Sequence, residues 1–357
     1  MFLRTQTRSV DVGGIVVGGG ARVSVQSMAK ADPHDVEAIV AQVSDCASLG
    51  CDLFRLTVPD VEAAKVLGEV KRRSPLPIVA DIHFDYRCAL AAIDAGADAL
   101  RLNPGNIGSR DRVQAVVRAA KERKVPIRIG VNLGSLQGDM RDELDAGRDD
   151  VPGVLVRSAL GHLKLLEDEG FRDVVISAKA SNVPDTIAAY RRLAEATDCP
   201  LHLGVTEAGT LIPGAVRNSV ALGVLLSEGI GDTIRVSLTG TSGKEVRVGL
   251  EVLRALGLRE PGPAITSCPT CGRTKVDLMH VASQVENAME TLAKDGVRLP
   301  RVAVMGCVVN GPGEAKGADV ALCGGDGEFL LYVHGAFVEK VPESDAVRRV
   351  MEHVVSM

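Results

Sequence analysis

Short apolar runs alternate with amphipathic stretches along most of the chain, from residue 23 to about residue 256. Each run has a β-type composition and is followed by a polar turn and a helix-compatible stretch, such as DVEAAKVLGEVKRR. The runs occupy residues 23–28, 53–59, 77–83, 99–105, 126–132, 174–181, 201–209 and 233–240. Eight β–α units in about 235 residues match a TIM barrel in number and length. A doubly wound sheet would have fewer strands and a Gly-rich dinucleotide turn after the first, so we predict an α/β fold with a (β/α)8 barrel.

Two segments depart from this repeat. Residues 9–21, SVDVGGIVVGGGA, contain two apolar runs around a glycine pair, which predicts a β-hairpin that plugs the bottom of the barrel. Residues 135–153, SLQGDMRDELDAGRDDVPG, form a charged insertion between the fifth and sixth predicted strands. We expect this insertion to be a mobile loop over the barrel mouth.

The repeat ends in a Pro/Gly-rich stretch at residues 258–265, LREPGPAI. Such a change of pattern indicates a domain boundary. We therefore predict a substrate-binding barrel at residues 1–258, a linker at 259–263 and a small α+β domain at 264–357. The second domain begins with a cysteine knuckle and continues with a helix, a strand, a Gly-rich loop, two β-runs and a final helix.

Composition and charge exclude some classes of function. The net charge is -5, aromatic residues make up 3% and Trp is absent, so neither an attraction for polyanions nor a stacking surface for single-stranded nucleic acid is expected. The first residues lack the continuous apolar region of a signal peptide, and no run approaches the ~18 apolar residues of a membrane span. We expect a cytoplasmic protein with no membrane or nucleic-acid partner, whose cysteines are thiols or metal ligands.

Polar residues gather at the carboxyl ends of the predicted strands, where TIM barrels place their active sites. They are Arg55, Asp81, His83, Arg101, Asn103, Arg128, Asn132, Ser177, Lys179, Glu207, Arg235 and Ser237. Five of them are Arg or Lys, and a buried cation needs a compensating charge. Salt bridges to Asp81 or Glu207 would supply it, and so would a bound phosphate or diphosphate. Five cations on one rim favour the anionic ligand.

Two side chains at this rim are candidates for proton chemistry. Glu207, in the turn VTEAG, is a proton donor if burial raises its pKa, and a countercharge to the arginines otherwise. His83 fits a structural role as well as a catalytic one.

The eight cysteines fall into two groups. Four lie on or beside predicted barrel helices at unrelated spacings, and we interpret them as packing residues: Cys46, Cys51, Cys88 and Cys199. The other four belong to the second domain: Cys268, Cys271, Cys307 and Cys323. The first pair of this second group forms a C-P-x-C knuckle, which needs further ligands to complete a metal site.

Two metal sites are consistent with this knuckle. Cys307 and Cys323 would complete a four-thiolate zinc site, although a zinc ribbon normally has a second C-x-x-C knuckle, which is absent. A [4Fe–4S] cluster would instead take three thiolates and one other ligand. The loop VVNGPGEA after Cys307 presents Glu314, whose carboxylate is harder and more easily displaced than a thiolate. We favour a cluster held by Cys268, Cys271, Cys307 and a displaceable Glu314.

The motifs CPTCGR at 268–273 and MGCVVNGPGEA at 305–315 resemble those of the 4-hydroxy-3-methylbut-2-en-1-yl diphosphate synthase family. So do the barrel segments VQSM, LFRLTVP, VADIHFDYR, LRLNPGNIG and GVTEAG. These are the iron–sulfur reductases of the methylerythritol phosphate pathway of isoprenoid biosynthesis. The resemblance covers essentially the whole chain, and it is to the compact two-domain bacterial form.

The resemblance implies a reaction and a site. The reaction is the reductive ring opening of 2-C-methyl-D-erythritol 2,4-cyclodiphosphate to 4-hydroxy-3-methylbut-2-enyl diphosphate by two one-electron transfers through a [4Fe–4S] cluster. Cys268, Cys271 and Cys307 would hold the cluster, with Glu314 as the fourth ligand that yields to a substrate oxygen. The cyclic diphosphate would bind to Arg55, Arg101, Arg128, Asn132, Lys179, Arg235 and Ser237. Asp81 and Glu207 would lie near the reacting carbons, with Glu207 as the proton donor.

The resemblance also implies partners. Ferredoxin or flavodoxin would donate electrons, and a homodimer would form composite sites in which the cluster domain of one subunit caps the barrel of the other. One departure is visible: after VQSM the family usually continues with a Thr-rich turn, whereas this chain has Ala29-Lys30-Ala31-Asp32. A second function class, a barrel transferase carrying a zinc module, is distinguished by metal content.

Overall fold

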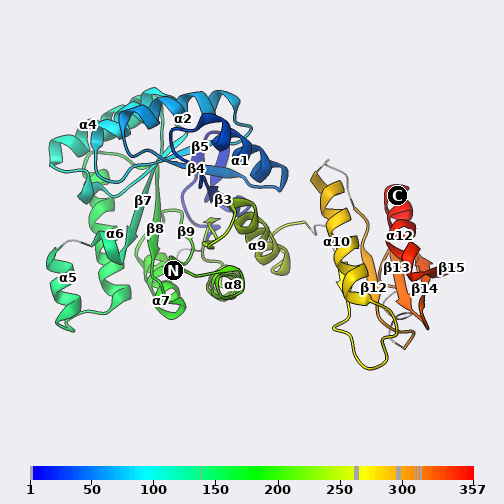
Figure 1. The fold of residues 1–357 in the computed structure, drawn as a ribbon. Coiled ribbons are helices and arrows are strands. Elements are labelled where there is room, and N and C mark those ends of the chain that lie inside the picture. The colour runs from blue at the N-terminus through cyan, green and yellow to red at the C-terminus, as the bar shows by residue number, and fades with distance from the viewer. Residues whose placement is uncertain are drawn as a thin grey trace. The chain divides into compact units, whose positions relative to one another are not determined.

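The computed structural model describes residues 3–136, 138–260, 265–294, 299–309, 311, 313 and 316–357 (Figure 1). The chain divides into two compact units, Met1–Arg259 and Glu260–Met357. No helix within these residues is long and apolar enough to span a membrane.

The first unit is the predicted (β/α)8 barrel. Its eight strands follow the order β8-β7-β6-β5-β4-β3-β10-β9, all neighbours are parallel, and a bridge between Ile176 and Leu201 joins the two ends. The strands are β3 (Ser24–Met28), β4 (Leu53–Thr57), β5 (Ile78–Asp81), β6 (Ala99–Leu102), β7 (Ile127–Asn132), β8 (Val174–Lys179), β9 (His202–Leu203) and β10 (Thr233–Ile234). The apolar runs therefore located every strand, although β9 and β10 are much shorter than predicted.

Helices alternate with these strands and form the outer layer (Figure 1). They are α1 (Val36–Ser48), α2 (Val61–Arg73), α3 (Tyr86–Asp94), α4 (Arg110–Arg123), α5 (Gly138–Asp145), α6 (Val151–Asp168), α7 (Val183–Ala196), α8 (Leu211–Ser227) and α9 (Ser242–Ala255). Short polar residues start several of them, as when Asp60 accepts the backbone N–H of Ala63 at 2.8 Å. Such N-caps compensate the unpaired N–H groups in the first turn of a helix.

A β-hairpin precedes the barrel, as the sequence predicted. Strand β1 (Val10–Val12) pairs antiparallel with β2 (Ile15–Val17). Buried hairpin valines pack against Leu53, Ala99 and Val175, which lie at or near the amino ends of barrel strands. The hairpin therefore closes the end of the barrel opposite the predicted site.

The charged insertion at 135–153 contains the helix α5 and the start of α6, so it is not the plain loop that the sequence suggested. Ion pairs hold it to the barrel. Arg157 of α6 lies 2.5 Å from Glu143 and 2.8 Å from Asp149, and Arg192 of α7 lies 2.6 Å from Asp150. Local helix propensity and these pairs order a segment that composition alone assigns to a loop.

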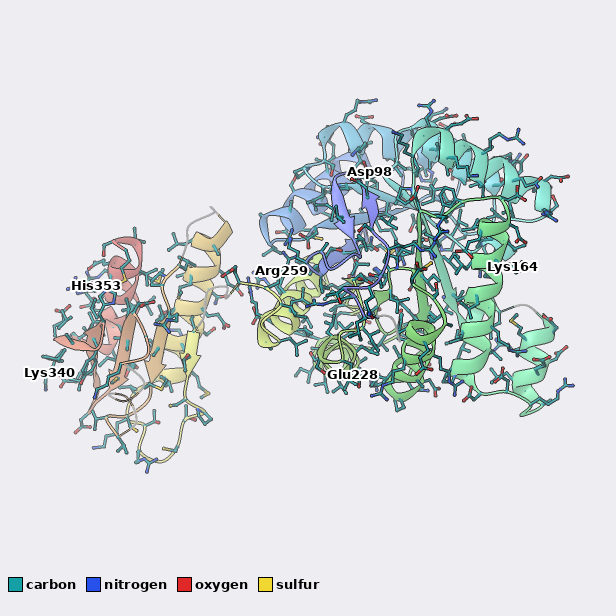
Figure 2. The ribbon with its side chains drawn as sticks, turned by 180° about the vertical axis from the view of Figure 1, so that it is seen from behind. Asp98, Lys164, Glu228, Arg259, Lys340 and His353 are labelled. Atoms are coloured by element: carbon teal, nitrogen blue, oxygen red, sulfur yellow. The ribbon has the colours of Figure 1, made fainter. Side chains whose placement is uncertain are left out.

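Arg259 ends the first unit (Figure 2). Its guanidinium pairs with the buried carboxylate of Asp52, which also accepts from Arg22 at 2.6 Å and from the backbone N–H of Val25 at 2.7 Å. The last residue of the unit is thereby tied to the segment that leads into β4.

Among the described residues, the second unit contains a five-stranded sheet in the order β11-β12-β13-β14-β15 and the helices α10 and α12. Its elements are β11 (Ile265–Ser267), α10 (Leu278–Lys294), β12 (Val302–Met305), β13 (Val320–Gly324), β14 (Glu328–Val333), β15 (Ala336–Pro342) and α12 (Ala346–Val355). The first three strands are parallel and the last two antiparallel. Leu322 of β13 packs with α10 and α12, whereas Cys323 packs on the other face with Cys268. The period of two along β13 thus separates a helix-covered core from a cysteine-bearing face.

Candidate active site

The carboxyl ends of the barrel strands enclose a cavity of about 220 Å³. Parallel strands end at one rim, so side chains from β3 to β10 converge there although they are far apart in sequence. The lining residues are Met28, Arg55, Asp81, His83, Arg101, Arg128, Gly130, Val131, Asn132, Ser177, Lys179, Val205, Thr206 and Arg235.

The cavity is strongly positive. Among the described residues that line it, five are Arg or Lys and only Asp81 is acidic. The cations are Arg55, Arg101, Arg128, Lys179 and Arg235. Cations held together away from bulk water repel one another, and an anionic ligand relieves that repulsion. The arrangement is therefore suited to an anion with more than one charge.

Asp81 balances two of the arginines. One of its carboxylate oxygens lies 3.4 Å from Nε of Arg55, and the other lies 3.2 Å from a terminal nitrogen of Arg101. Burial alone would raise the pKa of Asp81, but Arg55 and Arg101 lower it to about 2. His83 approaches the same carboxylate only to 3.9 Å and is half-exposed. Asp81 is thus a permanent anion that fixes the two guanidinium groups.

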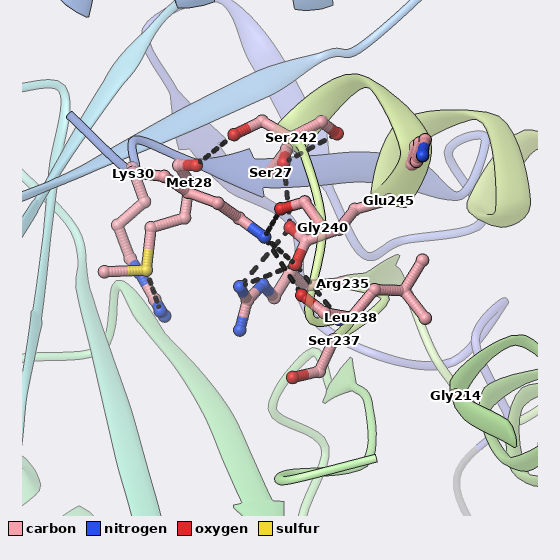
Figure 3. Close-up of polar contacts among 12 residues, drawn as sticks. Ser27, Met28, Lys30, Gly214, Arg235, Ser237, Leu238, Gly240, Ser242 and Glu245 are labelled. Carbon is pink, nitrogen blue, oxygen red and sulfur yellow. Dashed lines mark hydrogen bonds and ion pairs between the residues drawn. The ribbon is translucent and has the colours of Figure 1, made fainter. Parts of the chain in front are cut away.

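Glu245 balances Arg235, and it was not among the predicted site residues because it lies on helix α9 and not at a strand end. Its buried carboxylate lies 3.2 Å from a terminal nitrogen of Arg235 and 3.0 Å from Nζ of Lys30 (Figure 3). The residues at the carboxyl ends of the strands do not include Glu245, which lies within a helix. The available signal was a glutamate on the same helical stripe as Val246, Gly249 and Leu250, all of which are buried.

Arg128 and Lys179 have no carboxylate within 4.0 Å among the residues that the structure describes. Arg128 donates to the neutral Oε1 of Gln26 at 3.2 Å. Lys179 extends over Gly204, where an added Cβ would fall 2.7 Å from its Nζ. Burial lowers the pKa of Lys179 well below its ordinary value, and Arg235, Arg128, Arg55 and Arg101 lower it further. Arg128 and Lys179 are therefore the two basic groups of the cavity without a carboxylate partner among the described residues, and burial together with the arginines favours the neutral form of Lys179 until an anion binds.

The structure does not bring every predicted residue into the cavity. Asn132 and Ser177 line it, whereas Glu207, Ser237 and Asn103 are not among the lining residues. Glu207 is exposed and follows Thr206, which does line it, with a left-handed φ of 53°. A positive φ is uncommon for a residue with a Cβ and is often found at functional sites.

The backbone of Ser237 is held from outside the cavity. Its carbonyl accepts from Asn218 Nδ2 at 3.2 Å. Asn103 is also occupied locally, because its side chain accepts the backbone N–H of Gly105 at 3.2 Å.

The cysteines of the second unit lie near one edge of its sheet. Cys268 directly follows β11 and Cys307 follows β12, and these two strands are parallel neighbours. Their carboxyl ends therefore place both cysteines at the same edge. The Sγ of Cys268 accepts the backbone N–H of Gly306 at 3.3 Å. All four cysteines of this unit are free thiols.

Arg273 lies near two of these thiols. Its guanidinium is within hydrogen-bonding reach of the thiols of Cys271 and Cys307, which raise its pKa. A cation at this position offsets the negative charge of cysteine ligands when they bind a metal. Cys323 is fully buried, and burial, together with the nearby Cys307, raises its pKa to about 12.

The donor set fits a thiolate-bound iron–sulfur group. It provides three accessible or half-buried thiols, a neighbouring cation and a backbone N–H donor to sulfur, which are features of such sites. Among the described residues, no three His, Cys, Asp or Glu side chains converge on a point that could hold a metal ion. Glu314, the predicted fourth ligand, lies outside the described residues.

Two family models together match nearly the whole chain. The GcpE TIM-barrel domain matches residues 7–250, and the GcpE protein C-terminal domain matches residues 264–356. The 4-hydroxy-3-methylbut-2-en-1-yl diphosphate synthase (flavodoxin) of Geobacter sulfurreducens is 52% identical over 96% of this chain and 95% of that protein. The protein of the same description from Clostridium acetobutylicum is 50% identical over 99% of both chains.

Two solved structures resemble about 70% of this chain in fold. The dihydropteroate synthase of Yersinia pestis superposes with a TM-score of 0.52 at 14% identity, covering 70% of this chain and 98% of that one. The dihydropteroate synthase of Xanthomonas albilineans gives a TM-score of 0.51 at 19% identity, over 71% of this chain and 100% of that one. At such identities the comparison supports the barrel fold only.

Proposed function

The chain belongs to the GcpE family, and on that premise we propose that it opens the ring of 2-C-methyl-D-erythritol 2,4-cyclodiphosphate reductively to give 4-hydroxy-3-methylbut-2-enyl diphosphate. The C–O bond that closes the ring breaks and leaves its oxygen on the diphosphate, and the neighbouring carbon–hydroxyl bond breaks, so that its oxygen leaves as water. A C=C bond forms between the two carbons, with two electrons and two protons taken up. The observation that supports this proposal most directly is the barrel cavity, in which five cations face one carboxylate. A cyclic diphosphate supplies the negative charge that the cavity lacks.

The diphosphate binds first to the cations without carboxylate partners. Arg128 provides charge that no acidic side chain of the described barrel compensates, and Lys179 becomes charged when the anion binds. Arg55 and Arg101, already oriented by Asp81, and Arg235, oriented by Glu245, complete the clamp. Charge-assisted hydrogen bonds of this kind contribute about 1.5–3 kcal/mol each. Asn132 supplies a neutral donor from the cavity wall, and Ser237 supplies one from the loop after β10, outside that wall.

Two carboxylates act near the carbon skeleton of the cyclodiphosphate in this proposal. Asp81 remains ionised and fixes the arginines beside the reacting carbons. Glu207 delivers a proton from the turn beside Thr206; this role comes from the family resemblance and not from burial, because the carboxyl is exposed. Both roles follow from the same premise.

The cofactor in this proposal is a [4Fe–4S] cluster held by Cys268, Cys271, Cys307 and Glu314. When bound, such a cluster supplies electrons one at a time at low potential. Arg273 balances the thiolate charge, and Gly306 donates its N–H to Cys268, which stabilises electron-rich sulfur.

Reduced flavodoxin is the proposed donor, because the relatives are described as flavodoxin-dependent, and ferredoxin is the alternative. We also propose a cytoplasmic homodimer in which the barrel of one subunit works with the cluster unit of the other.

Anaerobic turnover tests the function. Reconstituted protein with reduced flavodoxin is expected to convert the cyclodiphosphate, and Arg128→Met is expected to raise KM at least tenfold. Arg123→Met is the matched control, because this arginine is exposed on helix α4 and its ion pair among the described residues is with Asp94. Absence of turnover by iron-loaded wild-type protein would refute the function, and an unchanged KM in Arg128→Met would refute the clamp.

Mixing Arg128→Met with Cys307→Ala tests the composite dimer, with activity measured at substrate concentrations far below the raised KM of Arg128→Met, where each variant alone is nearly inactive. Arg128→Met lacks a barrel function and Cys307→Ala lacks a cluster ligand, so a mixed dimer retains one intact site only if a site combines two subunits. Recovery of activity after mixing and subunit exchange supports the composite arrangement. Each variant alone, taken through the same exchange, is the control, and a mixture as inactive as the separate variants contradicts it.

A further inference from the structure

Glu245 is a buried carboxylate with four donors, although it does not line the cavity. Its side chain is 1% exposed. It accepts from Ser27 Oγ at 3.1 Å and from the backbone N–H of Leu238 at 3.1 Å, in addition to its contacts with Arg235 and Lys30 (Figure 3). A buried carboxylate is costly unless its lone pairs and its charge are both satisfied. Glu245 has hydrogen-bond donors for its lone pairs and two cations for its charge, so its position is well defined.

Lys30 lies in the loop after β3 and does not line the cavity. Its Nζ donates to the carbonyls of Leu238 at 3.0 Å and Gly240 at 2.5 Å, as well as to Glu245 at 3.0 Å. The loop after β3 is thereby fastened to the loop after β10 (Figure 3). Ser242 adds a second connection, because its hydroxyl donates to the carbonyl of Met28 at 2.7 Å.

Sharing of the carboxylate has an electrostatic consequence. Asp81 divides its charge between Arg55 and Arg101, and Glu245 likewise divides its charge between Arg235 and Lys30. A carboxylate paired with Arg235 alone would neutralise it almost fully. With Lys30 on the other side, Arg235 is held in place but keeps charge for an anion in the cavity.

We propose that Glu245 is a positioning residue that holds the Arg235 guanidinium at the cavity rim, and that Lys30 shares its charge so that Arg235 remains an anion-binding group. This inference rests on the proposed function, because it takes the cyclodiphosphate as the anion. Glu245 touches no substrate; it acts through Arg235.

Calorimetric binding of the cyclodiphosphate to the full-length chain tests the proposal, and it needs no turnover. Glu245→Gln keeps the shape and an acceptor but removes the charge, and we expect the Kd to rise about tenfold, which corresponds to about 1.4 kcal/mol. Glu245→Asp retains the charge and is expected to bind with intermediate affinity. Glu251→Gln is the matched control, since this residue lies on the same helix, is 68% exposed and pairs with Arg254.

The outcomes separate the positioning role from fold stability and from the proposed function. A weaker affinity in Glu245→Gln with a melting temperature near that of wild type supports positioning. An unchanged or tighter affinity overturns it, because Glu245 would then be only a countercharge that competes with the ligand. A wild-type chain that does not bind the cyclodiphosphate would overturn the proposed function, and this inference with it.

Lys30→Met keeps the proposal testable if the buried Gln variant does not fold. Lys30 is 31% exposed, so its loss leaves no buried polar group of its own. We expect the Kd to rise about threefold, because Glu245 then pairs with Arg235 alone. An affinity equal to that of wild type in a folded Lys30→Met protein would overturn the sharing of charge.

Discussion

The side chain of Arg101 extends over the backbone of Gly130 on the neighbouring strand. A terminal nitrogen of Arg101 donates to the carbonyl of Gly130 at 3.0 Å, and a Cβ on residue 130 would fall 2.3 Å from Nε of the arginine. Glycine at this position therefore makes room for a guanidinium that reaches Asp81 at 3.2 Å. The absence of a side chain is part of the site.

Gly130→Ala is expected to displace Arg101 from Asp81 and to weaken cyclodiphosphate binding by about tenfold, or about 1.4 kcal/mol. Stability should fall by only about 1 kcal/mol, because a partly exposed arginine moves more easily than a backbone. Calorimetry and thermal denaturation measure the two effects. Gly161→Ala in helix α6 is the control, because no atom lies within 4 Å of its added Cβ, and it should leave binding unchanged. Equal affinities in the two variants would contradict the role of Gly130.

Lys179 should take up a proton when the dianion binds. Burial, followed by the neighbouring arginines, lowers its pKa in the free cavity, and a bound diphosphate supplies negative charge that raises it again. At pH values below the ordinary lysine pKa of about 10.4 we therefore expect proton uptake on binding, measured by calorimetry in buffers of different ionisation enthalpy. Lys179→Met should bind more weakly and without this uptake. Proton uptake that persists in Lys179→Met would assign it to another group.

Cys307→Ala and Cys323→Ala should differ in iron content. Cys307 lies at the sheet edge with Cys268 and within reach of Arg273, whereas Cys323 is fully buried beside Gly311. After anaerobic reconstitution we expect about four irons per chain in wild type and in Cys323→Ala, and loss of colour and iron in Cys307→Ala. Stoichiometric zinc without iron in wild type would instead support the four-thiolate zinc site. Loss of metal in both variants would make Cys323 a ligand.

His162 should make the barrel less stable in mild acid. Burial lowers its pKa to about 4, so between that value and the ordinary value of about 6.5 the unfolded chain binds a proton that the folded chain does not. Stability therefore falls as the pH decreases through this window, by about 1.4 kcal/mol per pH unit. His162→Gln should reduce the difference in unfolding free energy between about pH 7 and about pH 5 by about 2 kcal/mol. Urea titrations at both pH values measure it, and parallel profiles for variant and wild type would contradict it.

The sequence determined the barrel because its signal is local and repeated. The apolar positions within each run and each following helical stretch show which side chains are buried. The parallel order of the strands follows from the alternation of strands and helices along the chain. It also determined which polar residues meet, such as Arg55 and Arg128, because all carboxyl ends of parallel strands share one rim. The N-terminal hairpin was predictable for the same local reason.

Tertiary structure alone decided how the charges are compensated. Asp81 was visible at a strand end, but Glu245 lies on a helix and meets Lys30 from a loop more than two hundred positions away. Nothing in a linear pattern records which carboxylate reaches which cation, because a charge pair depends on distances of a few ångströms between side chains brought together by closure of the barrel. For that reason the strand ends could be located from sequence, whereas the pairing of Arg235 with Glu245, and the lack of a carboxylate partner for Arg128 and Lys179 among the described residues, could not.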